Sequence, residues 1–516
     1  MTPAAGAVVS WWPAVAVALP LAGVAVSAAF GWTERRRDGL LAALAFGALV
    51  VALGLGAAVL AGRTPEVRLL HMTSQLWMLL RVDAVGALYG ATVAGLGLLA
   101  LVYAFGYVRP GPRRARFFAF FMACLACTLG VAYAGNLLTF LVFYEAFSVL
   151  TYALVIHEQT PAAVAAGTKY IAYILVGGSL VLAGVLLTFF LAGDLSFVGG
   201  GFLPADAAPG QLLVAFWCFV AGFGVKAALV PLHGWVPDAH PAAPAPFSAL
   251  LSGVMVAAGA FGIMRVVFDV FGVALFGSLG VAPWLTALAA LTVLVGAALA
   301  LGQADVKRRL AYSTISQMGY LTLAVSLAGS GVMAGGLVHL VHHAFMKGTL
   351  FFCAGLWIHV AGARRLAELR GVGARMPLTT AAFTLAALGM IGVPPLSGFV
   401  SKWWLGIGML EIGQGLALAV LLAGALLAAA YLLPVVYAAY FAPPEGRAPA
   451  ADRAAADGRA AAGPPAWGGA REAPWTMLGP TLVAAALTLV FGLGSHLRGF
   501  PLAFAERAAR AWFGGG

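Results

Sequence analysis

The stretch "GFGVKAALVPLHGWVPDAHP", residues 222–241, places a lysine, two histidines and an aspartate beside a long apolar run. Prolines 231, 237 and 241 interrupt its second half. The segment is too apolar for a loop in water and too broken for an ordinary membrane helix. Irregular backbone is tolerated at membrane depth only where it is buried in protein or lines a polar cavity. The stretch therefore predicts a broken membrane helix in which Lys226 faces such a cavity.

The composition of the whole chain agrees with a membrane location. Its 516 residues are 62% hydrophobic and 9% charged, with a mean hydropathy of +0.98. This balance excludes a soluble globular protein and indicates a polytopic, all-α membrane protein. The net charge of +11 sits in short basic tracts between apolar runs, which is typical of loops rather than of a nucleic-acid-binding surface. The CxxC at Cys124 and Cys127 lies within an apolar run, so we interpret it as helix packing.

Apolar runs of about 20 residues mark the expected membrane spans. The sequence predicts about 14 transmembrane helices, centred on 9–32, 39–61, 83–107, 117–134, 136–157, 170–192, 212–232, 247–268, 283–303, 310–329, 332–359, 379–410, 414–441 and 475–496. No basic residue precedes the first run, which predicts a retained helix rather than a cleaved signal peptide.

The basic tracts predict the orientation of the chain. Residues 35–37, 109–116, 305–309 and 363–375 are rich in arginine, and each tract follows an odd-numbered run. The loop after the thirteenth run is also basic, and the loop after the second run, with Arg63, Arg68 and Arg81, is an exception. The positive-inside rule then places both termini outside the cytoplasmic membrane of the cell.

The chain divides into five expected parts. These are N-terminal helices 1–3 at 1–110, a first repeat of helices 4–8 at 111–270, a second repeat of helices 9–13 at 271–441, a flexible linker at 442–474, and a C-terminal helix and tail at 475–516. The linker is rich in Ala, Gly and Pro and has no apolar periodicity. Neither a P-loop nor a dinucleotide-binding fingerprint is present, so we expect no nucleotide cofactor.

Four ionisable residues lie deep within apolar runs: Glu145, Lys226, Lys347 and Lys402. Placing each at the bilayer centre costs at least roughly 2.5–3.5 kcal/mol on insertion scales, so each is a candidate functional group. A single one could instead be a snorkelling or paired residue that only orients packing. Four such groups in one chain favour an ion path.

The prolines add a second signal. Pro231 follows Lys226, whereas Pro394 and Pro395 precede Lys402. Two broken helices with their lysines on opposite sides of the break predict two inverted five-helix repeats, with an ion path at their interface.

Histidines supply further proton carriers. His339, His343 and Lys347 recur every four residues and share one helix face, while His342 lies off that stripe. A metal or haem site would need ligands from a second helix, and we expect neither. A packed helix face is the plain alternative, and a proton relay is the interpretation that we favour.

Four more residues are auxiliary candidates. His233 and His240 flank the proline-rich corner after Lys226 and are expected to line the cytoplasmic entrance. Asp305 and Lys307 lie in the loop before the tenth run. They are either part of the path or a basic anchor of the positive-inside kind.

Four ordered motifs carry a family resemblance: "VKAALVPLHGWVPDAHPAAPAPFSALLSG", "DVKRRLAYSTISQMGY", "HLVHHAFMKGTLFF" and "GVPPLSGFVSKWWL". From about residue 80 to 440, the chain resembles the proton-conducting antiporter-like subunits of respiratory complex I, membrane-bound hydrogenases and Mrp-type Na⁺/H⁺ antiporters. Among these it looks most like the MrpD type. The resemblance implies fourteen helices and two inverted five-helix repeats.

The resemblance also implies roles for matching residues. Glu145 would pair with Lys226, Lys347 would feed the exit side, and Lys402 would be the terminal lysine. One position departs from the family pattern. A basic residue is usual in the eighth helix, where this chain has Ala257, and the basic residue of that segment is Arg265 near its end.

The expected function is a proton-translocating subunit of a multi-subunit antiporter, coupled to Na⁺ or another monovalent cation. The alternative is a proton-pumping membrane subunit of a complex I-like NADH:quinone oxidoreductase or a membrane-bound hydrogenase. A stand-alone permease is a third possibility. In each case the expected partners are protons and the bilayer, with other membrane subunits in the first two and no redox centre on this chain.

Overall fold

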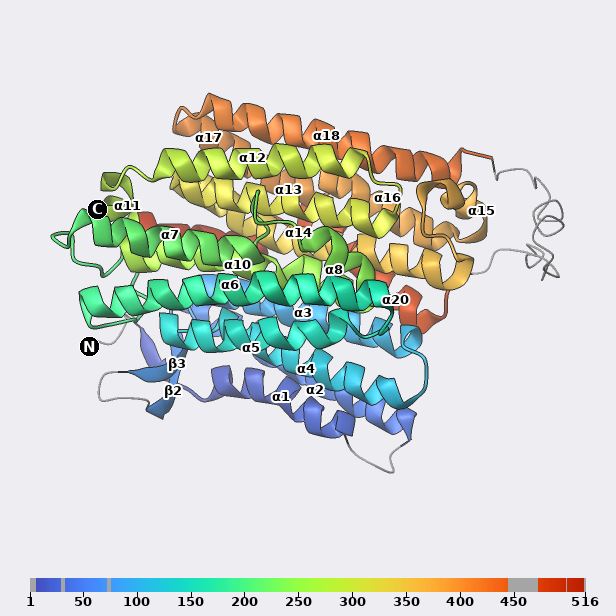
Figure 1. Cartoon of the computed structure of the whole chain (residues 1–516), viewed down its shortest axis with the longest axis horizontal. Helices are drawn as coiled ribbons and strands as arrows, with labels where there is room; N and C mark the ends of the chain where they lie inside the picture. Colours follow the sequence, from blue (N-terminus) through green and yellow to red (C-terminus); the bar gives the residue numbers. More distant parts are fainter. Residues whose placement is uncertain (1–5, 29–32, 72–75, 444–471, 498, 515–516) are drawn as a thin grey trace.

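The computed structural model of the chain is a bundle of helices that run along its long axis (Figure 1). It describes residues 6–28, 33–71, 76–443, 472–497 and 499–514. Within these residues, eleven helical segments are long and apolar enough to span a membrane. Helix α1, helix α13 and the pair α16–α17 complete fourteen crossings among the described residues, as the sequence predicts.

The first seven crossings are α1 (Trp12–Ala28), α2 (Glu34–Leu60), α3 (Ala84–Tyr107), α4 (Pro112–Ala132), α5 (Leu137–Val155), α6 (Pro161–Ala192) and the pair α7 (Pro209–Lys226) and α8 (Val236–Ala242). The eighth contains α9 (Ala245–Leu250), η1 (Leu251–Met255), α10 (Ala257–Arg265), η2 (Val266–Phe271) and α11 (Gly272–Ser278). The ninth to eleventh are α12 (Ala282–Leu301), α13 (Val306–Leu327) and α14 (Ser330–Leu356), which continues into η3 (Trp357–Ala361).

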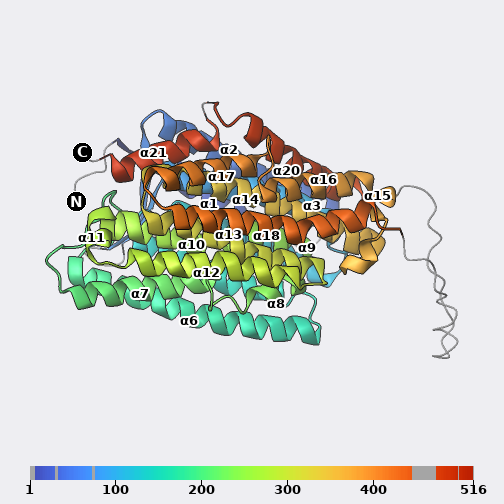
Figure 2. The ribbon, with the colours of Figure 1, turned by 90° about the horizontal axis from the view of Figure 1, so that it is seen from above.

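Two short helices, η4 (Leu366–Leu369) and α15 (Val372–Arg375), lead to the twelfth crossing. The last three crossings are the pair α16 (Pro377–Ile391) and α17 (Ser397–Glu411), then α18 (Gly415–Tyr440) and α20 (Trp475–Leu493). Of the predicted linker, residues 444–471 lie outside the described residues. Helix α21 (Pro501–Phe513) follows the last crossing, where the sequence predicts only a tail, and it lies against the bundle (Figure 2).

A small sheet that the sequence does not predict lies at one end of the bundle. Strand β1 (Ala7–Val9) pairs in parallel with β2 (Thr64–His71), which pairs antiparallel with β3 (Trp77–Arg81). Arg81 bonds to Glu66 across the hairpin with Nε 2.8 Å from Oε2. The basic loop that departs from the orientation pattern is therefore largely this hairpin.

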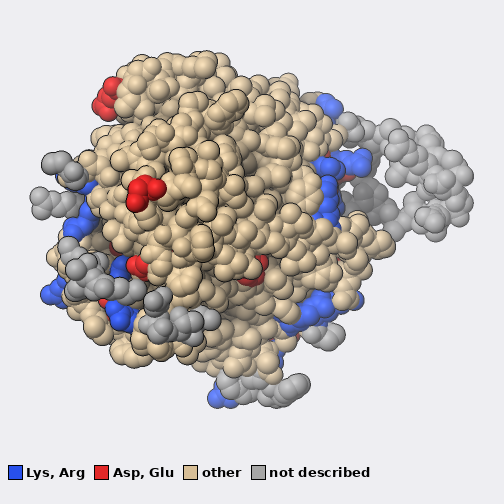
Figure 3. Space-filling model, turned by 60° about the vertical axis from the view of Figure 1, so that its left-hand side comes forward, with Lys and Arg blue, Asp and Glu red and all other residues tan. Residues whose placement is uncertain are grey.

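The two ends of the bundle differ in charge. Both termini lie at the end that carries the sheet, which we call the sheet end (Figure 1). The opposite end, the basic end, carries the tracts at 35–37, 109–116, 305–309 and 363–375. Between the ends, most of the visible surface is uncharged (Figure 3). This distribution suits a protein whose middle faces hydrocarbon.

Both predicted helix breaks are present. The seventh crossing stops at Lys226 and resumes at Val236, and the twelfth stops at Ile391 and resumes at Ser397. Lys226 precedes its break and Lys402 follows its own. The fold therefore has the broken helices that the prolines predict.

The eighth crossing is more irregular than its apolar sequence predicts. It continues to Ser278, and it contains π-helical turns at η1 and η2 on either side of α10, which begins at Ala257. A π turn leaves backbone carbonyls out of the normal helical pattern. One of them, at Val254, accepts a 2.7 Å hydrogen bond from the Tyr89 hydroxyl of α3.

Helix α13 is polar yet buried. Ser313, Thr314, Ser316 and Gln317 are fully buried near its middle. Buried polar side chains are expected to find hydrogen-bond partners, and α13 packs against α12 and α14. Helix α13 therefore places buried polar side chains beside α14, the helix that carries the histidines.

Candidate functional site

Lys226 lies at the end of α7 in a box of aromatic rings. Its Nζ is 4.3 Å from the centre of the Phe147 ring, 5.4 Å from that of Tyr170 and 5.9 Å from that of Trp235. It donates a 3.0 Å hydrogen bond to the Tyr170 hydroxyl. The side chain is fully buried. The ring faces stabilise the ammonium form without a direct counter-ion.

Glu145 lies near Lys226, the residue with which the family resemblance implies that it pairs. The two side chains interact electrostatically, yet no carboxylate oxygen of Glu145 comes within the 4 Å of an ion pair. Glu145 Oε1 is buried and has no hydrogen-bond partner among the described residues. A Cβ built on Gly178 of α6 would overlap it. The carboxylate is therefore held against the backbone of α6.

His240 lies inside the protein, although the sequence predicts a position at the entrance. It is fully buried on α8, with its ring 5.5 Å from that of Phe351. Neither ring nitrogen has a hydrogen-bond partner among the described residues. The ring is within electrostatic range of lysines on three different crossings, namely Lys307, Lys347 and Lys226. His240 is therefore a buried imidazole within electrostatic range of both Lys226 and Lys347.

Lys347 occupies the middle of α14 and is fully buried. Its Nζ donates to the Ser313 hydroxyl at 2.6 Å and to the Leu310 carbonyl at 3.1 Å, both on α13. Ser313 also bonds to the Tyr431 hydroxyl of α18 at 2.7 Å. Lys347 is thus linked through the Ser313 hydroxyl to the Tyr431 hydroxyl of α18.

The histidine stripe of α14 has the predicted geometry. The rings of His339 and His343 are 6.1 Å apart, and His342 points elsewhere and stacks on Phe491 of α20. His339 bonds through Nδ1 to Ser401 at 3.1 Å and through Nε2 to Gln317 at 3.0 Å. His343 has no hydrogen-bond partner among the described residues. His343 and His339 therefore extend along α14 from Lys347 to the contact with Ser401 of α17.

Lys402 lies one turn into α17, after the break. Its Nζ donates to the carbonyls of Met390 at 2.7 Å and Ile391 at 2.9 Å. These carbonyls end α16 and have no helical partner. The ammonium also lies 5.5 Å from the centre of the Tyr320 ring. Lys402 therefore binds the carbonyls that end α16, and it lies within electrostatic range of His339.

The remaining candidates lie in the break of the seventh crossing and at the start of α13. His233 is half-buried in the loop between α7 and α8, within electrostatic range of Lys169. Asp305 caps α13, accepting from the Arg308 amide at 2.9 Å, and pairs with Arg364. Lys307 is almost completely buried, unlike the loop anchor that the sequence allows as an alternative.

A second charged region lies at the sheet end, and sequence reasoning gives it no role. The buried Arg265 guanidinium bonds to both carboxylate oxygens of Asp83 and, at 2.8 Å, to Asp269. Asp269 also accepts a 2.7 Å hydrogen bond from the Trp512 indole of α21. Asp83 and Asp269 therefore neutralise the charge of Arg265, which does not belong to the row of relay lysines.

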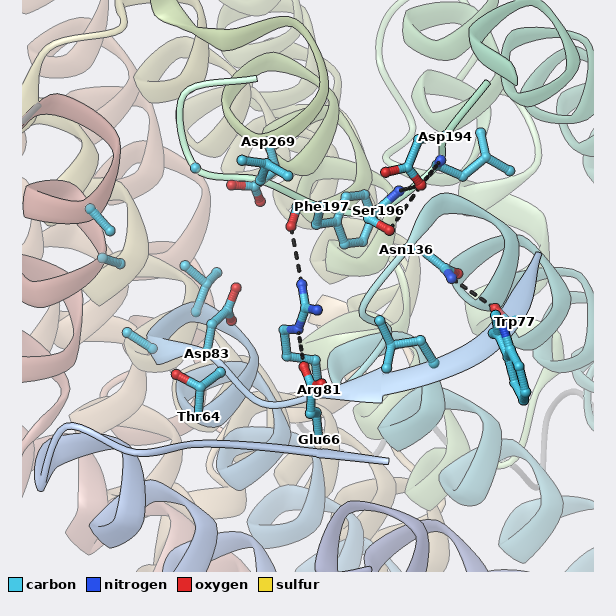
Figure 4. A pocket seen from close by; sticks show the side chains of 18 of the residues that line it. Thr64, Glu66, Trp77, Arg81, Asp83, Asn136, Asp194, Ser196, Phe197 and Asp269 are labelled. Carbon is cyan, nitrogen blue, oxygen red and sulfur yellow. Dashed lines mark hydrogen bonds and ion pairs between the residues drawn. The ribbon is translucent and has the colours of Figure 1, made fainter. Parts of the chain in front are cut away.

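This region borders a cavity of about 640 Å³ (Figure 4). In it Arg81 lies between the Glu66 carboxylate and the Phe197 carbonyl, which it approaches at 2.8 and 3.4 Å. The loop residue Asp194 binds the hydroxyl of Ser196 at 2.9 Å. The polar groups of the cavity thus largely satisfy one another.

Sequence reasoning misses the groups that surround the relay candidates. Tyr170 and Trp235 are ordinary aromatic residues of apolar segments, and only the fold brings both to Lys226. Asp83 is far from Arg265 in the chain. A signal exists for Asp83 alone, since Asp followed by an apolar run is a helix-cap pattern.

The arrangement suits proton transfer. Lys226, Lys347 and Lys402 each have hydrogen-bond acceptors or ring faces, and none has a carboxylate within 4 Å among the described residues. Histidines with free ring nitrogens lie between them. Amines and imidazoles that have lone pairs or N–H groups available can both accept and donate a proton. No group of three or more His, Cys, Asp or Glu that could hold a metal ion occurs in the described part of the chain.

Comparison with known proteins identifies the family of the chain. The family described as NADH:quinone oxidoreductase/Mrp antiporter, TM matches residues 134–428. The chain belongs to this family. It is a proton-translocating, antiporter-like membrane subunit, as the sequence motifs predict.

Proteins similar to this chain come from different kinds of complex. The chain is 37% identical over 356 residues to NADH-quinone oxidoreductase subunit N of Desulforudis audaxviator, a match that covers 67% of this chain and 70% of that protein. It is 33% identical over 364 residues to hydrogenase-4 component B of Escherichia coli, covering 67% of this chain but only 53% of the relative. Its fold matches a chain of the Mrp complex from Dietzia sp. with a TM-score of 0.85 and 26% identity, covering 98% of both chains.

Proposed function

We propose that this subunit conducts protons through a relay of Glu145, Lys226, Lys347 and Lys402 as part of a multi-subunit cation/proton antiporter of the Mrp type. The observation that carries the proposal is the row of three lysines, Lys226 and Lys347 fully buried and Lys402 partly buried, without carboxylate partners within 4 Å among the described residues. A structural lysine buried for packing alone would be expected to have a paired charge.

His240, His343 and His339 complete the row in this proposal. His240 lies within electrostatic range of both Lys226 and Lys347. His343 and His339 continue along α14 from Lys347 toward Ser401, the neighbour of Lys402 in the chain. In this proposal His240 of α8 takes the place of the basic residue that the family usually has in the eighth helix. The proton path does not require a basic side chain at Ala257.

The antiporter form of the proposal rests on the match along almost the whole chain to the Mrp complex. Partner membrane subunits, a place as the MrpD-type component and coupling to Na⁺ or another monovalent cation are part of this proposal. So is the placement in the cytoplasmic membrane with the basic end inside, which follows the positive-inside rule.

The second candidate is a proton-pumping subunit of a complex I-like oxidoreductase or a membrane-bound hydrogenase. The identity of 37% to a protein named as a component of an NADH-quinone oxidoreductase favours it. Purification of the tagged chain from its native membrane separates the two. Small antiporter subunits in the isolated complex support the first candidate, and iron–sulfur subunits support the second.

The relay itself is tested by Lys226→Ala and Glu145→Ala in the assembled complex. We expect both to abolish cation-dependent proton uptake by membrane vesicles, because removal of one proton-transfer group costs about a hundredfold or more in rate. Thr188→Ala on α6 is a buried control outside the row. Complex assembly, followed by blue native electrophoresis, should persist in all three. Normal uptake in the Lys226 and Glu145 variants would exclude the relay.

A further inference from the structure

A charged cavity of about 900 Å³ opens at the basic end between the α5–α6 loop, α8 and the start of α13. Most of its charged side chains belong to ion pairs. Asp238 binds Lys169 at 2.8 Å and Arg308 at 3.3 Å, and Asp305 binds Arg364. These pairs are satisfied at the surface, so they offer little to a proton that enters from solution.

Lys307 differs from every other lysine or arginine that lines this cavity. It is only 3% exposed, and no carboxylate lies within 4 Å of its Nζ among the described residues. Its Nζ donates to the Ala243 carbonyl and, at 3.3 Å, to the Pro241 carbonyl. Both carbonyls lie where α8 ends, so neither has a regular helical partner.

The groups that Lys307 holds belong to the same short helix as His240. His240 precedes Pro241 directly, and Lys307 is one of the three lysines within its electrostatic range. Lys307 is itself within range of Asp305, Arg364 and Glu158. One side of Lys307 therefore meets the cavity, and the other meets the helix that carries the unpartnered imidazole.

We propose that Lys307 is a proton-loading site that takes protons from this cavity and passes them to His240. In this step one N–H bond of the Lys307 ammonium breaks and one N–H bond forms on a free ring nitrogen of His240. The neutral Lys307 amine then regains a proton from the cavity. The inference rests on the proposed proton relay and adds an entry point to its central section.

The hydrogen bonds of Lys307 allow this cycle. An ammonium has three N–H groups, and two of them suffice for the two carbonyls. A neutral amine keeps two N–H groups and gains a lone pair. Lys307 can therefore lose and regain a proton while it continues to hold the end of α8.

The competing role for Lys307 is a purely structural clamp on those carbonyls. Lys307→Arg separates the two roles, because a guanidinium still donates to carbonyls but does not release its proton. Lys307→Met removes both functions. Arg308→Gln is the matched control, since it removes the neighbouring positive charge from the same cavity.

Proton uptake by vesicles that contain the assembled complex should fall about tenfold or more in both Lys307 variants and stay within about twofold in Arg308→Gln. Wild-type uptake in Lys307→Arg would show a structural clamp and overturn the proposal. If Lys307 variants are active while Lys226→Ala is inactive, the entry point fails and the relay stands. If Lys226→Ala is active as well, the relay fails.

A double-variant cycle tests the proposal even if Lys307→Arg does not assemble. His240→Gln should lower uptake by about the same factor as Lys307→Met, and the double variant should be no slower than either, since the two act in series. Losses that multiply in the double variant would show independent roles and overturn the proposed transfer.

Discussion

Lys226 shows how a buried amine is accommodated without a bonded carboxylate. Three aromatic rings and one hydroxyl surround it, and Glu145 remains beyond ion-pair distance. A tight ion pair at this depth would hold the proton on the lysine, because separating two buried charges costs several kcal/mol. Each desolvated cation–π contact stabilises the ammonium by about 2 kcal/mol or more, without placing a fixed anion against it. An environment without a bonded carboxylate suits a lysine that must exchange its proton.

The position of the Glu145 carboxylate depends on the absence of a side chain at Gly178. Gly178→Ala places a methyl group against Oε1, so the carboxylate must move. We expect proton uptake by vesicles to fall several-fold while the complex still assembles. Gly54→Ala on α2 is the control, because a Cβ there meets no atom within 4 Å. Equal uptake in the two variants would mean that the placement of Glu145 does not matter.

Single residues are predictable where one helix determines their geometry. Residues 339, 343 and 347 share a face because of the helical repeat, and the 6.1 Å between the first two rings agrees with it. The prediction for His240 is wrong because its local sequence shows only a proline-rich corner. Its burial depends on α14, which supplies Phe351. A contact between distant elements leaves no local signal in the sequence.

At the scale of elements, each helix irregularity near the relay is matched by a side chain from another element. The end of α16 is held by Lys402, the end of α8 by Lys307 and the π turn of η1 by Tyr89. Freed carbonyls within a bilayer must be satisfied by protein or water. Two of the three donors are lysines, so the groups that satisfy the breaks are also groups able to carry protons.

Sequence reasoning finds long apolar elements well and short polar elements poorly. All fourteen crossings have a matching predicted run, because about 20 apolar residues are a strong signal. The three strands escape prediction because β1 and β3 have only 3 and 5 residues, and because β2, "TPEVRLLH", is charged and contains a proline. The π turns of the eighth crossing also leave no pattern, since that segment is apolar on all sides and uniformly buried.

Arg265 connects three elements at the sheet end, and its removal tests their attachment. Arg265→Gln leaves the buried Asp269 carboxylate without its positive partner, which should destabilise the protein by about 3–5 kcal/mol. The Tm of the purified protein in detergent micelles should fall accordingly. Adding Asp269→Asn removes the unpaired charge and should recover part of the Tm. No recovery in the double variant would mean that the loss has another cause.

The whole molecule is asymmetric along its long axis. Both termini, the sheet and α21 lie at one end, and the arginine-rich tracts lie at the other (Figures 1 and 2). The entry cavity beside Lys307 opens at the basic end. If the basic end is cytoplasmic, protons enter this cavity from the cytoplasm. The direction of transport in the proposal therefore depends on the orientation of the chain.

The orientation is tested by single cysteines at the two ends of the bundle. Ala367→Cys lies in η4 at the basic end, and Ala205→Cys lies in the loop before α7 at the sheet end; both positions are exposed. Basic loops are retained inside, so a membrane-impermeant maleimide added to intact cells should label Ala205→Cys and spare Ala367→Cys. Disrupting the membrane should expose both. The unmodified chain is the control, because its four cysteines lie within membrane helices. Labelling of Ala367→Cys in intact cells would place the basic end outside and reverse the proposed direction of proton entry.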